Sequence, residues 1–237
     1  RQPTTGVWKS SWEKQMSEMT GVRGRERIAR QVASDLLEIG AVFLRPDEPF
    51  TWASGIKSPI YCDNRLILGH PQIRRRVERA MAEVVRNAFP AVQTVMGTAT
   101  AGIAHAALTA ELLDLPMGYV RGGAKGHGRG NQIEGAYRPG QKTVVIEDLI
   151  STGGSSVEAA QVLQDAGLEV LGVLSIFTYG MGRADETFAA AGIPHTSLTD
   201  LDTLVQVALE RNYLTEIQAP EVLRFRDDPA GWASEGN

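Results

Sequence analysis

Cysteine is nearly absent from this chain, since Cys62 is the only one among 237 residues. A single thiol cannot form a disulfide within the chain, which excludes a disulfide-stabilised fold and favours a cytoplasmic location. The residues around Cys62 offer no evident base. We therefore expect a structural thiol rather than a nucleophile.

Long apolar runs and an excess of positive charge are also lacking. No run approaches the roughly 20 apolar residues that span a bilayer, so we expect no membrane segment. The formal net charge of −4 argues against a general nucleic-acid-binding protein. His70, His105 and His195 show no metal-ligand spacing, and we expect no structural zinc site.

A regular alternation of strand and helix patterns is present instead. It predicts an α/β fold, in which helices flank a central parallel sheet. A weaker helical stretch, 216–225, follows the alternation, and Pro220 is expected to interrupt it. The predicted strands are 92–97, 117–121, 142–148, 170–178 and 193–197, and the predicted helices are 101–113, 155–166, 183–191 and 200–209.

These patterns indicate a single domain over residues 20–226. Helices are predicted at 25–39 and 71–89, with a strand at 41–44 and a hairpin at 50–63 that turns at Ser54-Gly55. The strand and hairpin lie mainly within residues 41–66, a small subdomain that we name the hood because it is expected to cover the sheet. Residues 1–19 are expected to be a disordered extension or an expression remnant, and residues 227–237 a loose tail.

The most informative stretch is residues 144–156, V-V-I-E-D-L-I-S-T-G-G-S-S. Its apolar start is typical of a strand buried on both faces of a parallel sheet, and ligands bind at the carboxyl ends of such strands. Gly153 and Gly154 let main-chain N–H groups approach an anion at a helix N-terminus. Hydroxyl groups for the same anion come from Ser151, Thr152 and Ser155.

Two adjacent acids, Glu147 and Asp148, stand between that strand and the glycine turn. They would repel a phosphate, so we expect them to face vicinal sugar hydroxyls, with a metal ion nearby. The stretch lacks the glycine spacing of a dinucleotide fingerprint and the Gly-Lys-Ser/Thr of a Walker loop. It therefore predicts a pocket for a ribose that carries a phosphate.

A glycine-rich segment, residues 122–132, interrupts the alternation. It has almost no apolar side chain and cannot join a core, and a long loop in a compact domain is usually functional or disordered. Lys125, His127 and Arg129 alternate, so in an extended chain they share one side. Three basic groups on a lid suit a polyanion such as pyrophosphate, whereas the alternative is a solvated linker.

Residues 144–156 resemble the motif of type I phosphoribosyltransferases that binds 5-phosphoribosyl 1-pyrophosphate (PRPP). Three further segments are similar to orotate phosphoribosyltransferases in particular. Residues 50–65 resemble the hood segment over the pyrimidine, 97–103 the loop that takes pyrophosphate, and 119–135 the catalytic loop. The resemblance implies transfer of the phosphoribosyl group from PRPP to orotate, giving orotidine 5′-monophosphate and pyrophosphate.

The resemblance also implies site residues, position by position. Arg121, Lys125 and His127 fall on the PRPP-contacting loop, and the implied catalytic residues are Lys125, His127 and Asp148. An Mg²⁺ ion would be held through PRPP and water near Glu147 and Asp148. In this family the loop, here residues 122–132, reaches the neighbouring subunit's site, which implies a homodimer. The ribose-5-phosphate motif falls on Glu147, Asp148, Leu149, Ile150, Ser151, Thr152, Gly153, Gly154 and Ser155.

The chain departs from the family pattern at several positions. Tyr61 and Cys62 replace a pair of phenylalanines seen in some members. Three lysines of some members are missing, and their positions are occupied by Ala53, Ala101 and Gly122. Candidates for the missing positive charge are Lys57, Arg65, Arg129 and additional bound Mg²⁺.

The expected orotate-binding residues are Ser151, Tyr61, Lys57 and Arg65. Ser151 falls where the family contacts orotate. We expect Lys57 or Arg65 to hold the orotate carboxylate, with Arg65 favoured because its planar guanidinium can pair with two oxygens. Arg183 is a weaker candidate, since its spacing after the strand at 170–178 does not align cleanly.

Two other functions remain open from the residues alone. A purine phosphoribosyltransferase would keep the motif at 144–156 but gives no reason for the segment at 54–65. A PRPP-sensing regulator would bind the ligand without turnover. It would be expected to carry a nucleic-acid-binding module, for which residues 1–40 are too short and show no recognition helix.

Overall fold

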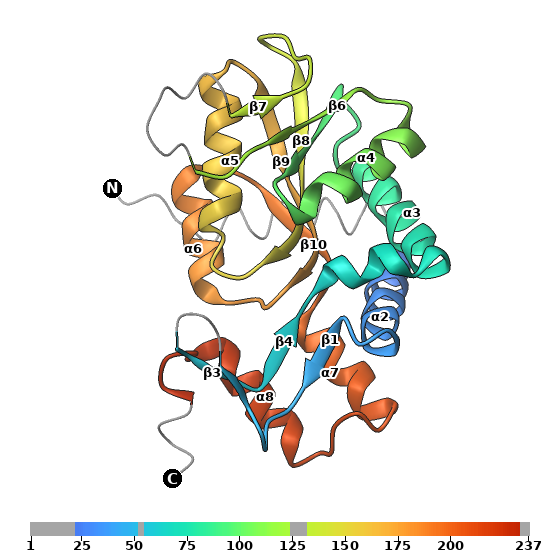
Figure 1. Ribbon diagram of the computed structural model, residues 1–237, viewed down its shortest axis with the longest axis vertical. Helices are drawn as coiled ribbons and strands as arrows, with labels where there is room; N and C mark the ends of the chain where they lie inside the picture. Colours follow the sequence, from blue (N-terminus) through green and yellow to red (C-terminus); the bar gives the residue numbers. More distant parts are fainter. Residues whose placement is uncertain (1–21, 52–54, 124–131, 233–237) are drawn as a thin grey trace.

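The computed structural model describes residues 22–51, 55–123 and 132–232, and its centre is a six-stranded sheet (Figure 1). The strand order is β10-β9-β8-β5-β6-β7. Every neighbouring pair runs parallel except β6 and β7, which run antiparallel. The expected α/β fold is therefore confirmed. The strands are β5 (Thr94–Thr98), β6 (Met117–Val120), β7 (Ile133–Glu134), β8 (Lys142–Ile150), β9 (Glu169–Thr178) and β10 (His195–Asp200).

Helices cover both faces of this sheet (Figure 1). Val144 and Ile146 of β8 belong to the core shared with α2, α3 and α4, whereas Val145 belongs to the core shared with α5 and α6. Burial on both faces explains the uninterrupted apolar run of β8, because alternate side chains of a strand point to opposite faces. No helix in the described ranges is long and apolar enough to cross a membrane. These helices are α2 (Val22–Glu38), α3 (Pro71–Ala88), α4 (Ala101–Leu113), α5 (Gly154–Asp165) and α6 (Gly182–Ala191).

The hood forms two short ladders, where the sequence predicts one hairpin. The strands β2 and β3 pair with each other, but β4 pairs with β1, with Ile60 opposite Leu44. The predicted pairing of residues 60–62 is therefore wrong. Ile60 is fully buried in the main core, and its partner on β1, Leu44, is partly buried and packs against the same core. The hood elements are β1 (Val42–Leu44), β2 (Phe50–Thr51), β3 (Lys57–Ser58), β4 (Ile60–Cys62) and the 3₁₀ helix η1 (Asn64–Gly69).

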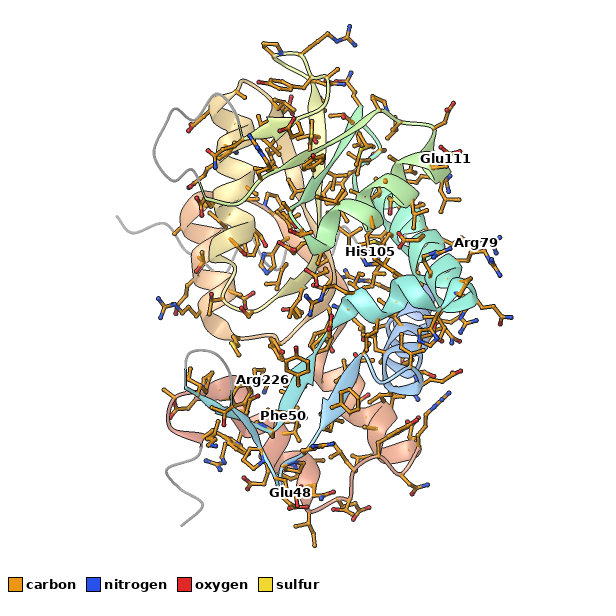
Figure 2. The ribbon with its side chains drawn as sticks, in the orientation of Figure 1. Glu48, Phe50, Arg79, His105, Glu111 and Arg226 are labelled. Atoms are coloured by element: carbon orange, nitrogen blue, oxygen red, sulfur yellow. The ribbon has the colours of Figure 1, made fainter. Side chains whose placement is uncertain are left out.

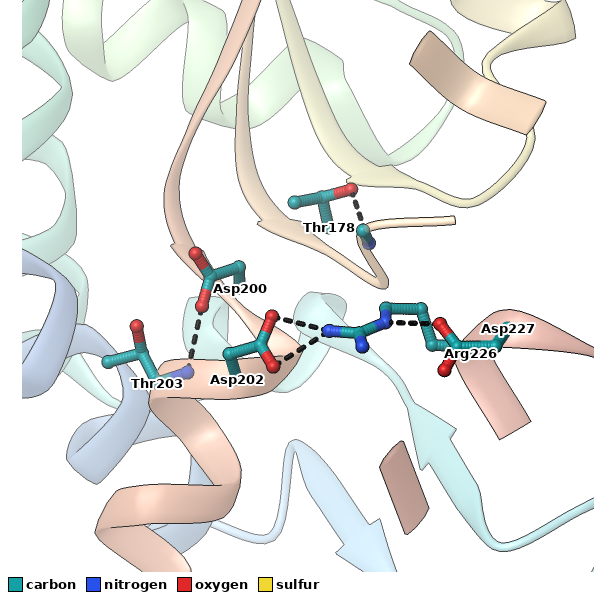
Figure 3. Close-up of polar contacts among 7 residues, drawn as sticks. Thr178, Asp200, Asp202, Thr203, Arg226 and Asp227 are labelled. Carbon is teal, nitrogen blue, oxygen red and sulfur yellow. Dashed lines mark hydrogen bonds and ion pairs between the residues drawn. The ribbon is translucent and has the colours of Figure 1, made fainter. Parts of the chain in front are cut away.

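Two C-terminal helices, α7 (Leu201–Glu210) and α8 (Gln218–Asp227), lie beside the hood (Figure 1). Asp200 caps α7 by accepting from the Thr203 N–H at 2.8 Å. Figure 3 shows Arg226 of α8 reaching Asp202 at the start of α7, with donor–acceptor distances of 2.6 and 2.7 Å. This contact joins the last helix to the end of the sheet where β10 stops.

The C-terminal region is more ordered than the sequence predicts. Pro220 does not interrupt α8, because it lies in the first turn, where a helix leaves N–H groups unpaired in any case. Trp232 falls in the predicted loose tail but is buried. Its indole N–H donates to the Glu221 carbonyl at 2.7 Å, and its ring contacts Phe225 edge-on. Trp232 therefore packs against α8, although Asp227, Asp228 and Ala230 beside it are exposed.

A buried polar cluster fastens α3 to α4. Glu78 and His105 are almost completely buried, and His105 Nδ1 lies 2.6 Å from Glu78 Oε1. Thr109 donates to the other carboxylate oxygen at 3.1 Å. Figure 2 shows His105 between the two helices. The contact holds α4 in place, and the N-terminus of α4 borders the cavity described below.

Candidate active site

A cavity of about 260 Å³ lies at the carboxyl ends of β5, β6 and β8. This is the edge of an open parallel sheet at which ligands bind. The main chains of three strands and the start of α5 therefore position its walls. The lining residues are Thr98, Ala99, Thr100, Ala101, Val120, Arg121, Gly122, Gln132, Glu147, Asp148, Leu149, Ser155, Glu158, Ala159 and Val162.

Several residues predicted from the sequence meet at this cavity: Arg121, Glu147, Asp148, Leu149 and Ser155. The rest of the predicted phosphate motif forms the turn between β8 and α5, and consists of Ile150, Ser151, Thr152, Gly153 and Gly154. The Ile150 side chain is buried in the core, and its carbonyl already accepts from the Tyr179 N–H and the Thr178 hydroxyl, so Ile150 supports the turn from the sheet side. Lys125 and His127 lie outside the described residues.

The turn between β8 and α5 presents main-chain N–H groups. Gly153 is the N-cap of α5, with a φ of 80°, and no side chain caps the helix. The first N–H groups of a helix have no partner within the helix and attract anions. A Cβ atom at Gly153 would lie 2.9 Å from the Phe188 ring of α6, so the turn is pressed directly against that ring. The turn that is expected to hold the phosphate thus packs directly against α6.

The two adjacent acids have different surroundings. The Glu147 side chain is buried, and its Oε1 accepts from the Thr98 hydroxyl at 2.7 Å and from the Asp148 N–H at 3.0 Å. Its Oε2 accepts from the Ser156 hydroxyl at 3.0 Å. Glu147 therefore ties the end of β5 to α5 in the described structure. This geometry favours Asp148 over Glu147 as the acid that meets sugar hydroxyls.

Burial, together with the adjoining Asp148 carboxyl, raises the pKa of Glu147 to about 7, although donation from Thr98 opposes the shift. An unfolded glutamate titrates near 4.3. Because the folded pKa is the higher one, this carboxyl favours the folded state fully below about pH 4, and that contribution is lost as the pH rises through 7.

We therefore expect the ligand-free protein, without metal, to lose about 3 kcal/mol of unfolding free energy between pH 4.5 and 8 through Glu147. Urea unfolding across this range measures the loss, and Glu147→Gln is the control, since glutamine does not titrate. Equal pH slopes for the wild type and the variant would contradict the assignment.

The cavity wall from Thr98 to Ala101 corresponds to the expected pyrophosphate loop, and includes a cis peptide between Ala99 and Thr100. A Cβ at Gly102 would lie 2.6 Å from the Ile146 carbonyl oxygen, so α4 approaches β8 very closely here. Arg121, at the end of β6, brings a cation to the lining and contacts Glu134 Oε1 at 3.3 Å.

The predicted orotate residues of the hood do not line this cavity. Tyr61 is half exposed and contacts Phe50, with ring centroids 5.7 Å apart. Lys57 donates to the Thr51 hydroxyl at 2.6 Å. Arg65 forms a two-point contact with Asp63, at 2.6 and 2.8 Å, which lowers the Asp63 pKa. Their contact with orotate stays a prediction.

Arg183, the weaker candidate, lies exposed in the first turn of α6. It is absent from the cavity lining. Phe188 and Ala184 of the same helix pack against Gly153 of the phosphate turn, so Arg183 lies near that turn in the fold.

The sequence analysis did not connect Glu158 or Asn64 with this site, and it placed Gln132, Thr98 and Ser156 in expected site segments without the roles that follow. Glu158 of α5 adds an acid to the lining, and Gln132 adds a buried amide. Asn64, in the hood, donates from Nδ2 to the Asp148 carbonyl at 2.7 Å. Thr98 and Ser156 hold Glu147. Helical spacing from Ser155 could have indicated Glu158, but no local signal points to Asn64.

Within the described ranges, no group of three or more His, Cys, Asp or Glu side chains is arranged to hold a metal ion. The cavity does place the carboxyl groups of Asp148 and Glu147 side by side. Mg²⁺ commonly binds through one or two carboxylates plus substrate phosphates. The donor set therefore fits an Mg²⁺ ion that enters with a phosphorylated substrate.

Comparison with known proteins agrees with this geometry. Residues 65–193 match the family model described as phosphoribosyl transferase domain. The orotate phosphoribosyltransferase of Bacillus subtilis (strain 168) is 56% identical over 206 residues, covering 87% of this chain and 95% of that protein.

Solved structures show the same relationship. The orotate phosphoribosyltransferase of Aeropyrum pernix superimposes with a TM-score of 0.68 at 32% identity, covering 78% of this chain and 99% of that one. The UMP synthase of Leishmania donovani gives a TM-score of 0.72 at 31% identity, covering 84% of this chain and 42% of that longer protein. With this fold, this cavity and these relatives, the chain belongs to the orotate phosphoribosyltransferase family.

Proposed function

We infer that this protein transfers the 5-phosphoribosyl group of PRPP to orotate, giving orotidine 5′-monophosphate and pyrophosphate in pyrimidine biosynthesis. The observation that carries the inference is the cavity at the end of β8. There Asp148 and Ser155, from the first turn of α5, line the same cavity, in a chain 56% identical to an orotate phosphoribosyltransferase.

The structure supports a mechanism of positioning and charge stabilisation. The N–H groups at the start of α5 bind the 5-phosphate, and Asp148 binds the ribose hydroxyls. The wall from Thr98 to Ala101, with Arg121, receives the pyrophosphate. As pyrophosphate leaves, the ribose carbon gains positive charge, and the nearby carboxylates stabilise it while the orotate nitrogen attacks.

We propose Mg²⁺ as the cofactor, which would be held through PRPP and water near Asp148 and Glu147. When bound, the ion neutralises charge on the pyrophosphate oxygens. The residues of the chain then have to orient the ribose and exclude water. Lys125 and His127, on the loop at 122–132, are proposed to contact the leaving group.

We also propose that the protein works as a cytoplasmic homodimer. The family resemblance of the loop at 122–132 supports the dimer, because the family uses this loop across the subunit interface. The single cysteine supports a reducing compartment.

The direct test mixes protein, Mg²⁺ and PRPP with orotate, hypoxanthine or adenine, and follows base consumption by absorbance. Loss of orotate alone is the expected result. Consumption of a purine instead would indicate a purine phosphoribosyltransferase, and binding of PRPP without turnover of any base would indicate a regulator.

Asp148→Asn should lower kcat/KM for PRPP by about 10- to 100-fold, the value of one lost hydrogen bond to a charged group. KM for orotate should change less. Asp114→Asn is the matched control: it makes the same change at the exposed far end of α4, where the left-handed backbone accepts asparagine readily. Equal losses in both variants would contradict the role of Asp148.

Charge reversal at Arg65 should raise KM for orotate by roughly tenfold, which corresponds to one charge-assisted contact. Lys57→Glu tests the alternative partner for the carboxylate. KM for PRPP serves as the internal control, since neither residue lines the cavity. An unchanged KM for orotate in both variants would remove both residues from the orotate site.

A further inference from the structure

Asn64 makes a contact that links the hood to the phosphoribosyl site. Its side chain is buried, with 1% exposure, although asparagine is usually found at the surface. The Nδ2 group donates to the main-chain carbonyl of Asp148 at 2.7 Å, across 84 residues of sequence. The Oδ1 atom accepts from the Cys62 thiol at 3.3 Å. Both ends of the amide are therefore used, which fixes its orientation.

The Asp148 carbonyl lies in the part of β8 that pairs with a neighbouring strand on one side only. The pairing of β5 with β8 ends at Gly97 and Ile146. Beyond that point β8 continues to Ile150 along β9 alone. A carbonyl at such an edge needs a donor from elsewhere, because buried main-chain groups are almost always paired. The Asn64 amide supplies that donor.

The surroundings of the contact favour a fixed connection. Burial, with the charges of Asp148 and Asp63, raises the pKa of the Cys62 thiol well above its usual value, so it stays protonated and donates to Asn64. Asp63 caps η1 by accepting from the Arg65 N–H. The cap thus fixes the start of η1, which is the segment that carries Asn64.

The hood carries the predicted orotate residues Tyr61 and Arg65, whereas β8 carries Asp148. We propose that Asn64 is a positioning residue, whose amide sets the spacing between the hood and the ribose-binding end of β8. This inference rests on the proposed function, since only a reaction that joins two substrates needs that spacing. Each substrate can bind without Asn64, but their reacting atoms then lose alignment.

The test compares Asn64→Asp with Cys62→Ser. Aspartate keeps the size of the side chain and the oxygen that faces Cys62, but it replaces the donor by an oxygen that faces the Asp148 carbonyl. We expect kcat to fall by about 10- to 100-fold, while KM for PRPP and for orotate stays within about threefold. Serine at position 62 still donates to Asn64, so Cys62→Ser should keep kcat.

Two results would overturn the proposal: an unchanged kcat in Asn64→Asp, whether or not KM rises, or an equal loss of kcat in both variants. A merely structural role would lower the melting temperature but leave kcat of the folded enzyme unchanged. If the wild type itself does not consume orotate, the proposed function fails, and that outcome is distinct from a normal Asn64→Asp enzyme beside an active wild type.

A second measurement needs no variant and covers the case in which Asn64→Asp does not fold. In the PRPP-bound wild type, NMR should detect a through-hydrogen-bond coupling between the Asn64 side-chain nitrogen and the Asp148 carbonyl carbon. The side-chain amide protons of Asn64 should also exchange slowly with solvent. Fast exchange in the PRPP complex would contradict the proposed link.

Discussion

Gly153→Ala should lower kcat/KM for PRPP by on the order of 10²-fold or more. Two effects combine at this position. An L-residue with a φ of 80° costs roughly 1–2 kcal/mol, and the new methyl group would lie 2.9 Å from the Phe188 ring. The turn must shift to relieve both, and a displacement of about 1 Å at a binding site can cost about 10² in rate. Steady-state kinetics with varied PRPP measures the effect.

Gly182→Ala provides the matched control. Gly182 lies at the start of α6, has no atom within 4 Å of a built Cβ, and does not adopt the left-handed backbone. The same chemical change there should leave kcat/KM for PRPP near the wild-type value. A wild-type value for Gly153→Ala would show that this turn does not position the phosphate.

A double variant separates the two causes. Phe188→Leu shortens the side chain that faces Gly153, so Gly153→Ala combined with Phe188→Leu should recover activity if the steric contact dominates. No recovery indicates that the backbone conformation dominates. The two positions touch, so their effects are not expected to add.

Lys125→Ala should lower kcat by roughly 10²–10³, by comparison with the loss of one stabilising donor at a transition state. The substitution lies outside the described residues, in the loop that leaves the cavity at Arg121 and Gly122. Among described residues the lining includes one cation, Arg121, so neutralising pyrophosphate needs further positive charge. The melting temperature should stay unchanged, because the segment has almost no apolar residue to contribute to a core.

Subunit mixing tests whether the loop acts in the neighbouring site. Lys125→Ala and Asp148→Asn subunits should each be weakly active alone. In a mixed dimer, one site receives a wild-type loop together with a wild-type Asp148, so activity should reappear after the two proteins are unfolded and refolded together. Mixtures that only average the two weak activities would restrict the loop to its own subunit.

The strand, turn and helix at 144–156 could be predicted because their signals are local. The signals follow one another along the chain: first the apolar residues of the strand, then the two acids, then the two glycines of the turn. The hood pairing could not be predicted in the same way. The pairing of Ile60 depends on its burial in the core and on β1, which is distant in the sequence. Neither can be recognised from the residues next to Ile60. The strand β7 was missed because two residues are too short to show a period.

Side-chain roles depended even more on packing between distant segments. Glu147 and Asp148 are neighbouring acids and look equivalent in sequence. Only the approach of Thr98 from β5 and Ser156 from α5 distinguishes the buried carboxylate from the other. Asn64 was missed for the same reason. Its partner is a main-chain carbonyl, and every residue has one, so the sequence gives no sign of the contact.

The short antiparallel pair β6–β7 has a consequence for the loop that it brackets. The Arg121 N–H donates to the Gln132 carbonyl at 2.8 Å, and Val120 stands opposite Ile133. Both ends of the loop are therefore tethered at the rim of the cavity. A tethered group acts at a local concentration of the order of millimolar, without any binding step of its own. If Lys125 and His127 contact the leaving group as proposed, a longer loop should lower their local concentration at the site, even with every side chain unchanged.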